Sequence, residues 1–131
     1  MNSINKNEPR TASISRAVTD NDTAAVWGDT FPPAASTPFV LGLAEITCHQ
    51  AVEDLLDDDE LTVGTSATIR HLAASPVGTT LTAKAVLVSR DRSRLTFTVE
   101  VQDSQGRTVA TVEHRRAIVD RDRVTTMLAQ G

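Results

Sequence analysis

The sequence predicts an α+β fold in which an antiparallel sheet of about five strands wraps around one long helix. Three observations predict it. A short β-prone segment at residues 11–18 precedes a long amphipathic segment at residues 38–56, and four further β-prone segments complete the chain. Short turn signals separate those four segments, which favours antiparallel hairpins. Because such a sheet has one face to cover and the chain offers one long helix, the helix should lie across that face.

Length and composition predict one domain of ordinary size. The chain has 131 residues, enough to bury one core without a disulfide or a structural metal. Residues 1–10 are polar and show no periodicity, so we expect a disordered N-terminal tail there. A single domain should then occupy residues 11–131.

Charge and hydropathy exclude several classes of partner. The chain carries 13 Lys and Arg residues against 17 Asp and Glu residues, a net charge of -4, which is the wrong sign for neutralising nucleic-acid phosphates. No segment reads as a signal peptide or a membrane span, and Cys48 is the only cysteine, so no internal disulfide can form. We therefore expect a cytoplasmic protein that binds neither nucleic acid nor membrane.

The long helix is expected over residues 38–56, with Thr37 as its N-cap and Pro38 in the first turn, where proline is tolerated. Its apolar residues recur at spacings of three, four and seven, so they should form one stripe that packs against the sheet; they are Leu41, Cys48, Val52, Leu55 and Leu56. An acidic run at residues 57–60 closes the helix.

The four later strands are expected at residues 61–71, 79–89, 94–103 and 108–120. A sheet of this kind wrapped around one helix is the hotdog architecture, which usually pairs into a dimer through strand edges. A cystatin-like or cone-shaped α+β domain fits the periodicity almost as well, so the pattern by itself leaves both open.

Glu45 is the residue that a purely structural helix would avoid. It follows Leu41 by four residues and precedes Cys48 by three, which places a carboxylate on the apolar stripe. A buried carboxylate needs a hydrogen-bonding partner or a raised pKa, and such sites are enriched in function. The alternative is that Glu45 lies at the margin of a wide stripe and reaches water.

His71 and Thr37 are the other polar candidates. His71 stands in alternation with Leu61, Val63, Ala67 and Ile69, so a regular strand would point its ring at the helix. There it could hydrogen-bond Glu45 and move protons, or be a satisfied histidine at the end of a strand. Thr37 could cap the helix and also contact a ligand, because the amides at a helix N-terminus favour developing negative charge.

Two further residues receive structural interpretations. His49 follows Glu45 by four residues and could form a helical pair or half of a metal site, but no further ligands at metal spacing support the second role. Cys48 lacks the signature of a nucleophile and is interpreted as a small core residue. The sequence also contains neither a phosphate-binding loop nor a nucleophile elbow.

Three segments of the chain resemble the hotdog thioesterase family that contains fluoroacetyl-CoA thioesterase. They are STPFVLGLAE leading into the helix, TVGTSATIRHLAASPVGTTLT after it, and the closing HRRAIVD. The spacing is specific: Glu45 follows Thr37 by eight residues and His71 follows Glu45 by twenty-six, with Gly64 between them. The resemblance extends over most of the chain from about residue 30.

The resemblance implies an acyl thioester hydrolase with a composite site at the interface of a homodimer. Thr37, Glu45 and His71 would be the catalytic set, and Gly64 would offer a backbone amide near the thioester oxygen across the interface. The substrate-binding residues would include Phe39 together with His114 and Arg116 of the closing His-x-Arg motif. The substrate would be an acyl-CoA or an acyl-carrier-protein thioester, with no cofactor and no metal.

The chain also departs from the family's pattern. Arg115 stands where an acidic residue is common and Val112 where a glycine is common, which bears on edge geometry and substrate entry. The proline-rich segment before the helix differs from the lid of the fluoroacetyl enzyme, so selectivity for fluoroacetate is not carried over. A basic turn formed by Arg90, Arg92 and Arg94 could meet coenzyme A phosphates, although such turns are usually solvated surface.

Several alternatives stay open. Glu45 could attack the carbonyl or activate a water molecule, with Thr37 positioning the thioester and His71 handling the proton. The same carrier chemistry would suit a hydratase or dehydratase, and a non-catalytic module that holds an acyl chain is possible on the same fold. With Trp27, three Phe and no Tyr, the pocket should be lined mainly by aliphatic and small side chains, which suits a short or flexible acyl group.

Overall fold

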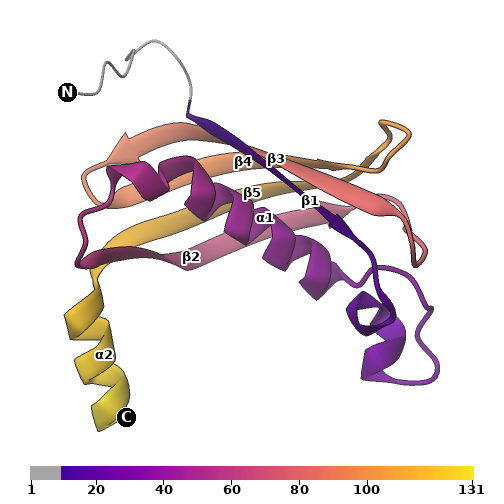
Figure 1. Cartoon of the computed structure of the whole chain (residues 1–131), viewed down its shortest axis with the longest axis horizontal. Coiled ribbons are helices and arrows are strands. Elements are labelled where there is room, and N and C mark those ends of the chain that lie inside the picture. Colours follow the sequence, from indigo (N-terminus) through magenta and orange to yellow (C-terminus); the bar gives the residue numbers. More distant parts are fainter. Residues whose placement is uncertain (1–9) are drawn as a thin grey trace.

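The computed structural model describes residues 10–131 as one antiparallel sheet with a long helix across one of its faces (Figure 1). The strands are β1 (Thr11–Ala17), β2 (Glu60–His71), β3 (Thr80–Asp91), β4 (Arg94–Gln102) and β5 (Thr108–Asp120). The helices are α1 (Thr37–Val52), α2 (Arg121–Gln130) and three short 3-10 turns, η1 (Asp20–Asp22), η2 (Ala24–Trp27) and η3 (Glu53–Leu55).

The sheet has the strand order β1-β3-β4-β5-β2, and every neighbouring pair is antiparallel. Figure 1 shows α1 lying diagonally across the sheet, between the two edge strands β1 and β2. The expected five-stranded sheet around one helix is therefore confirmed. Because β2 is an edge strand, one side of its backbone has no strand partner within residues 10–131.

The core lies between α1 and the inner face of the sheet, but the buried face of the helix differs from the expected stripe. Cys48 and Val52 are fully buried, whereas Leu41, Leu55 and Leu56 are only half-buried. The helix instead buries a face that is rich in small residues: Val40, Leu43, Ala44, Thr47, Cys48, Ala51 and Val52. Small side chains let the helix approach the sheet closely, and a stripe counted only from large apolar residues misses them.

The helix is also shorter than expected. It ends at Val52, and residues Glu53–Leu55 form a tighter 3-10 turn in place of the last helical turn. Such tightening satisfies carbonyl groups that have no partner at a helix C-terminus. Leu55 therefore leaves the helical stripe and packs at the margin of the core.

The N-terminal tail expected at residues 1–10 lies outside the described residues, except for Arg10. Arg10 is held by the fold at both its backbone and its side chain. Its carbonyl accepts a hydrogen bond of 2.9 Å from the amide of Leu87, and its guanidinium donates to Asp54 at 2.6 Å. These two contacts join Arg10 to β3 and to the end of the helix segment.

A bulge in β2 determines which of its side chains face the helix. The pairing with β5 shifts between Gly64 and Ser66, so Thr65 is an extra residue in the strand. After the bulge, Ala67 pairs with the buried His114 and Ile69 pairs with the buried Val112. Before it, Thr62 and not Val63 is the residue buried against the helix.

The structure thus corrects the expected alternation of β2. Leu61 and Val63 do not share a face with His71, because one inserted residue reverses the alternation of the strand. The odd-numbered positions face the helix only after the bulge.

The C-terminal helix α2 was not expected from the sequence. Asp120 caps it, accepting from the amides of Asp122 and Arg123, and none of its residues is buried. Figure 1 shows α2 projecting beyond the end of β5, away from the sheet. Within residues 10–131, neither α2 nor any other helix has the length and apolar character needed to span a bilayer.

Candidate active site

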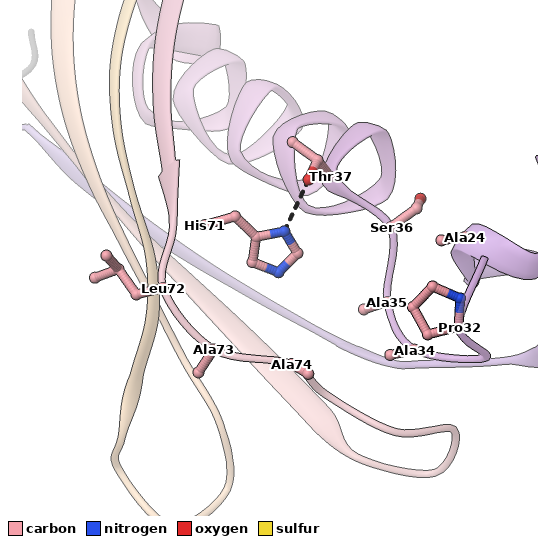
Figure 2. A pocket seen from close by; sticks show the side chains of 10 residues that line it. All are labelled: Ala24, Pro32, Ala34, Ala35, Ser36, Thr37, His71, Leu72, Ala73 and Ala74. Carbon is pink, nitrogen blue, oxygen red and sulfur yellow. Dashed lines mark hydrogen bonds between the residues drawn. The ribbon is translucent and has the colours of Figure 1, made fainter. Parts of the chain in front are cut away.

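Thr37 and His71 form one half of the candidate site. Thr37 is the first residue of α1 and His71 the last residue of β2, and Thr37 Oγ1 lies 2.8 Å from His71 Nδ1. Figure 2 shows the two side chains pointing toward each other. A hydroxyl that is hydrogen-bonded to an imidazole is the arrangement in which a proton can pass between them.

The N-cap of α1 is Ser36 and not Thr37, contrary to expectation. Ser36 Oγ accepts a hydrogen bond of 3.2 Å from the amide of Phe39, which satisfies one of the free N–H groups of the first turn. Because Ser36 caps the helix, the hydroxyl of Thr37 is available to hydrogen-bond His71.

A pocket of about 410 Å³ opens beside this pair (Figure 2). Apart from Ser36, Thr37 and His71, its walls are apolar and mostly small: Ala24, Pro32, Ala34, Ala35, Leu72, Ala73 and Ala74. His71 Nε2 is buried and has no hydrogen-bond partner within the described residues. A buried polar atom without a partner is costly, so this nitrogen is the one best placed to gain a partner from a ligand or another subunit.

Glu45 belongs to a second cluster, made with residues of β2 and β5. Its Oε2 accepts a hydrogen bond of 3.1 Å from Arg116 Nη1 and lies 3.7 Å from His114 Nε2. The Glu45 side chain is 40% exposed, so it lies at the margin of the buried helix face and reaches solvent. The structure therefore combines both expectations for Glu45, since the carboxylate has an ion-pair partner and an open side.

Gly64 makes room for that carboxylate. A Cβ atom at this position would lie 2.8 Å from Glu45 Oε2 and 3.2 Å from His114 Cε1. The first distance is shorter than a real Cβ contact, so a side chain at this position would displace the end of the Glu45 side chain.

The protonation of His114 follows from its contacts. Its Nδ1 lies 2.8 Å from the carbonyl oxygen of Ser66, which can only accept, so Nδ1 carries the proton. Burial lowers the pKa of His114, and the nearby charge of Arg116 lowers it further. The ring is therefore neutral, and its Nε2 accepts a hydrogen bond of 3.0 Å from Arg116 Nη1.

Arg116 and His49 complete the second cluster through Thr62. Arg116 donates to both oxygens of Thr62, and the hydroxyl of Thr62 lies 2.6 Å from His49 Nδ1. His49 thus has a threonine as its partner, and not the helical pairing with Glu45. Sequence reasoning missed Thr62 because regular alternation assigned it to the outer face of the strand.

The remaining candidates have plain structural positions. Phe39 is half-buried and packs against the core, and it does not line the pocket beside Thr37. Cys48 is buried, and burial raises the pKa of its thiol to about 12, which suits a core residue and not a nucleophile.

Within one chain the two clusters do not meet. Glu45 lies eight residues along α1 from Thr37, a rise of about 12 Å, and its hydrogen-bond partner is Arg116 and not His71. The structure therefore brings Thr37 to His71, and Glu45 to Gly64, His114 and Arg116.

Comparison with known proteins gives a consistent result. Residues 18–122 match the family model described as fluoroacetyl-CoA-specific thioesterase. The fluoroacetyl-CoA thioesterase of Streptantibioticus cattleyicolor is 31% identical over 100 residues, which cover 76% of this chain and 71% of that protein. A solved structure of the fluoroacetyl-CoA thioesterase FlK superposes with a TM-score of 0.88 at 25% identity, covering 96% of this chain and 97% of the other.

The fold itself extends to more distant proteins. A thioesterase superfamily member from Thermus thermophilus has a TM-score of 0.86 at 19% identity and covers 94% of this chain and 90% of its own. A hotdog-like protein from Thermanaerovibrio acidaminovorans has a TM-score of 0.83 at 18% identity, with 93% and 90% covered. With its hotdog fold and its match over most of its length, this chain belongs to the fluoroacetyl-CoA-specific thioesterase family of thioester hydrolases.

Proposed function

We propose that this protein hydrolyses short acyl-CoA thioesters at a site built from Thr37, His71 and Glu45 across a homodimer. The observation that carries the proposal is the 2.8 Å contact between Thr37 and His71 beside an apolar pocket, in a chain of a thioesterase family. Relatives of this chain are named for fluoroacetyl-CoA, and one is described in complex with fluoroacetate and CoA.

The dimer is supported by two surfaces that lack a partner within residues 10–131. One is the outer edge of β2, whose free backbone groups suit strand pairing. The other is the exposed side of α1, where Ile46 is 54% exposed one residue after Glu45. Both surfaces adjoin Glu45 and Gly64, so one two-fold contact would cover them together.

Antiparallel pairing of two β2 strands would also unite the two clusters. Gly64 and His71 both lie on the inner face of β2, so a two-fold axis that crosses the strand between them would bring His71 of one subunit toward Gly64 of the other. The unpartnered His71 Nε2 would thereby approach the Glu45 cluster of the second subunit.

The chemistry divides between the two clusters. Thr37 holds the thioester beside His71, and His71 delivers a proton to the departing thiolate and regains one from the water that adds its hydroxyl to the acyl group. Glu45 uses its second carboxylate oxygen, which has no hydrogen-bond partner within residues 10–131, to attack the carbonyl or to activate water. The amide of Gly64 and the N-terminus of α1 stabilise the oxyanion, each donor contributing roughly 3 kcal/mol.

The acyl group is limited by the pocket walls. Five alanines, Pro32 and Leu72 form an uncharged surface, which favours short apolar acyl groups over charged ones. Selectivity for fluoroacetate is not part of the proposal.

The first experiment is a screen of short, branched and aromatic acyl-CoAs, with acyl-carrier-protein thioesters beside them, measured by release of free thiol. Hydrolysis of short acyl-CoAs that Glu45→Gln abolishes supports the proposal. Hydration of an enoyl-CoA without thiol release would instead indicate the hydratase alternative, and thermal stabilisation by acyl-CoA without turnover would indicate a binding module.

Subunit complementation tests the shared site. When Glu45→Gln and His71→Ala proteins are mixed and exchanged, about half of the dimers are heterodimers, and each has one complete site if the two residues act across the interface. Activity should then return to about a quarter of the wild-type value. A mixture as inactive as its components would show that each site uses residues of one subunit only.

A further inference from the structure

The guanidinium of Arg116 is clamped along one edge by a single residue, Thr62. Arg116 Nε donates to Thr62 Oγ1 at 2.8 Å, and Arg116 Nη2 donates to the carbonyl oxygen of Thr62 at 3.0 Å. Both residues are buried, with Thr62 7% and Arg116 9% exposed. Two bonds from one residue to one edge of a planar group fix both its position and its plane.

The nitrogen on the other side of the same guanidinium contacts residues of the candidate site. Arg116 Nη1 donates to Glu45 Oε2 at 3.1 Å and to His114 Nε2 at 3.0 Å. Because the guanidinium is rigid, a displacement of the edge held by Thr62 moves the nitrogen that holds Glu45. Thr62 therefore influences the orientation of the Glu45 carboxylate without contacting it.

The hydroxyl of Thr62 is itself fixed by His49. It accepts from Arg116 Nε and also lies 2.6 Å from His49 Nδ1, so the hydroxyl has a hydrogen-bond partner on each side. A valine of the same shape would lose both contacts.

We propose that Thr62 is a positioning residue for thioester hydrolysis, which orients Arg116 and through it Glu45, with His49 locking the Thr62 hydroxyl. The inference rests on the proposed function, because it needs Glu45 to act in the reaction. Thr62 does not line the pocket beside Thr37, so its effect should fall on kcat and leave KM nearly unchanged.

The test compares Thr62→Val with Thr62→Ser, by steady-state kinetics on the best acyl-CoA from the screen. Thr62→Val keeps the shape, removes the hydroxyl and should lower kcat about 10- to 100-fold with KM within about twofold, as expected for a misplaced catalytic group. Thr62→Ser retains the hydroxyl and should restore most of kcat. If Thr62→Val fails to fold, Thr62→Ala, which adds no clash, takes its place.

The chain offers a matched control in Thr47. It is a fully buried threonine whose hydroxyl donates to the carbonyl of Leu43 at 2.7 Å, inside α1 and outside the cluster. Thr47→Val should change thermal stability but not kcat. Wild-type kcat in Thr62→Val, no recovery in Thr62→Ser, or an equal loss of kcat in Thr47→Val would each overturn the inference.

The Glu45→Gln protein separates this inference from the proposed function. If Glu45→Gln is inactive while Thr62→Val is fully active, the positioning role is wrong and the function stands. If Glu45→Gln hydrolyses the thioester at the wild-type rate, the role of Glu45 itself is wrong, and the positioning role falls with it.

Discussion

A Cβ atom on Gly64 would lie 2.8 Å from Oε2 of Glu45, so the glycine and the carboxylate occupy adjoining space. Gly64→Ala must therefore displace the end of the Glu45 side chain. A flexible side chain yields at little cost in folding free energy, but a catalytic carboxylate that moves by about 1 Å loses about 100-fold in rate. We expect Gly64→Ala to lose most of its thioesterase activity and to change its midpoint of urea unfolding little.

Gly28→Ala is the control for that substitution. Its Cβ would meet the ring of Phe31 at 3.5 Å, an ordinary van der Waals distance, and Gly28 is not among the residues that line the pocket. It should retain wild-type activity. An active Gly64→Ala protein would show that the carboxylate does not need its present position.

The buried neutral His114 predicts a dependence of stability on pH. Burial and Arg116 hold the pKa of His114 below its ordinary value of 6.5. Just below pH 6.5, His114 is therefore protonated in the unfolded chain but still neutral in the folded chain. The free energy of unfolding should therefore rise with pH between the lowered folded pKa and 6.5. Below the folded pKa, the loss of stability caused by His114 should have reached its full value.

Urea unfolding of the wild type and of His114→Asn, measured in steps from about pH 5 to about pH 8, checks this dependence. The asparagine amide can still donate to the carbonyl of Ser66 but does not titrate. The rise in stability across this window should be smaller in the variant. An equal slope in both proteins would assign the titration to other groups.

The presence and approximate extent of the helix and the later strands could be predicted from the sequence, because apolar residues recur with different periods in helices and strands, although the face that each element buries was predicted only in part. The site could be predicted only in part, for physical reasons that particular residues show. The bulge at Thr65 reverses the alternation of β2, and no single residue type marks such an insertion, so regular alternation predicts the wrong face for Leu61 and Val63 and gives no reason to single out Thr62. Ser36 and Thr37 are both good N-caps by residue type, and only the structure shows that Ser36 caps the helix while Thr37 contacts His71.

Contacts between residues far apart in the sequence also could not be predicted from the hydrophobic pattern. The contact between Arg116 and Glu45 joins residues 71 positions apart, and the residues at its two ends carry no local signal of their pairing. The segment α2 has an effective cap in Asp120 but buries no residue, so it lacks the buried apolar stripe that makes α1 recognisable.

Cys48 should be inert in the native protein. It is buried, and burial raises the pKa of its thiol to about 12, so almost no thiolate exists at neutral pH. A disulfide reagent should label the native protein only as fast as the core opens, and should label it at once in concentrated urea. Ser104→Cys in a Cys48→Ala background places a thiol on an exposed turn and should react immediately. Rapid labelling of native Cys48 would contradict the packing of α1 on the sheet.

The alanine walls of the pocket predict how the acyl range can be narrowed. Ala74 lines the pocket beside His71 and is exposed, so a larger side chain there fills the cavity without disturbing the core. Ala74→Phe should reduce kcat/KM for the longest accepted acyl-CoA about 10-fold or more, since an overfilled apolar pocket costs about 1–3 kcal/mol, while acetyl-CoA is affected less. Ala129→Phe, on the exposed helix α2, controls for the added aromatic surface and should leave the acyl range unchanged. An Ala74→Phe protein with the wild-type acyl range would place the acyl group outside this pocket, and the thioester would then have to approach Thr37 from another side.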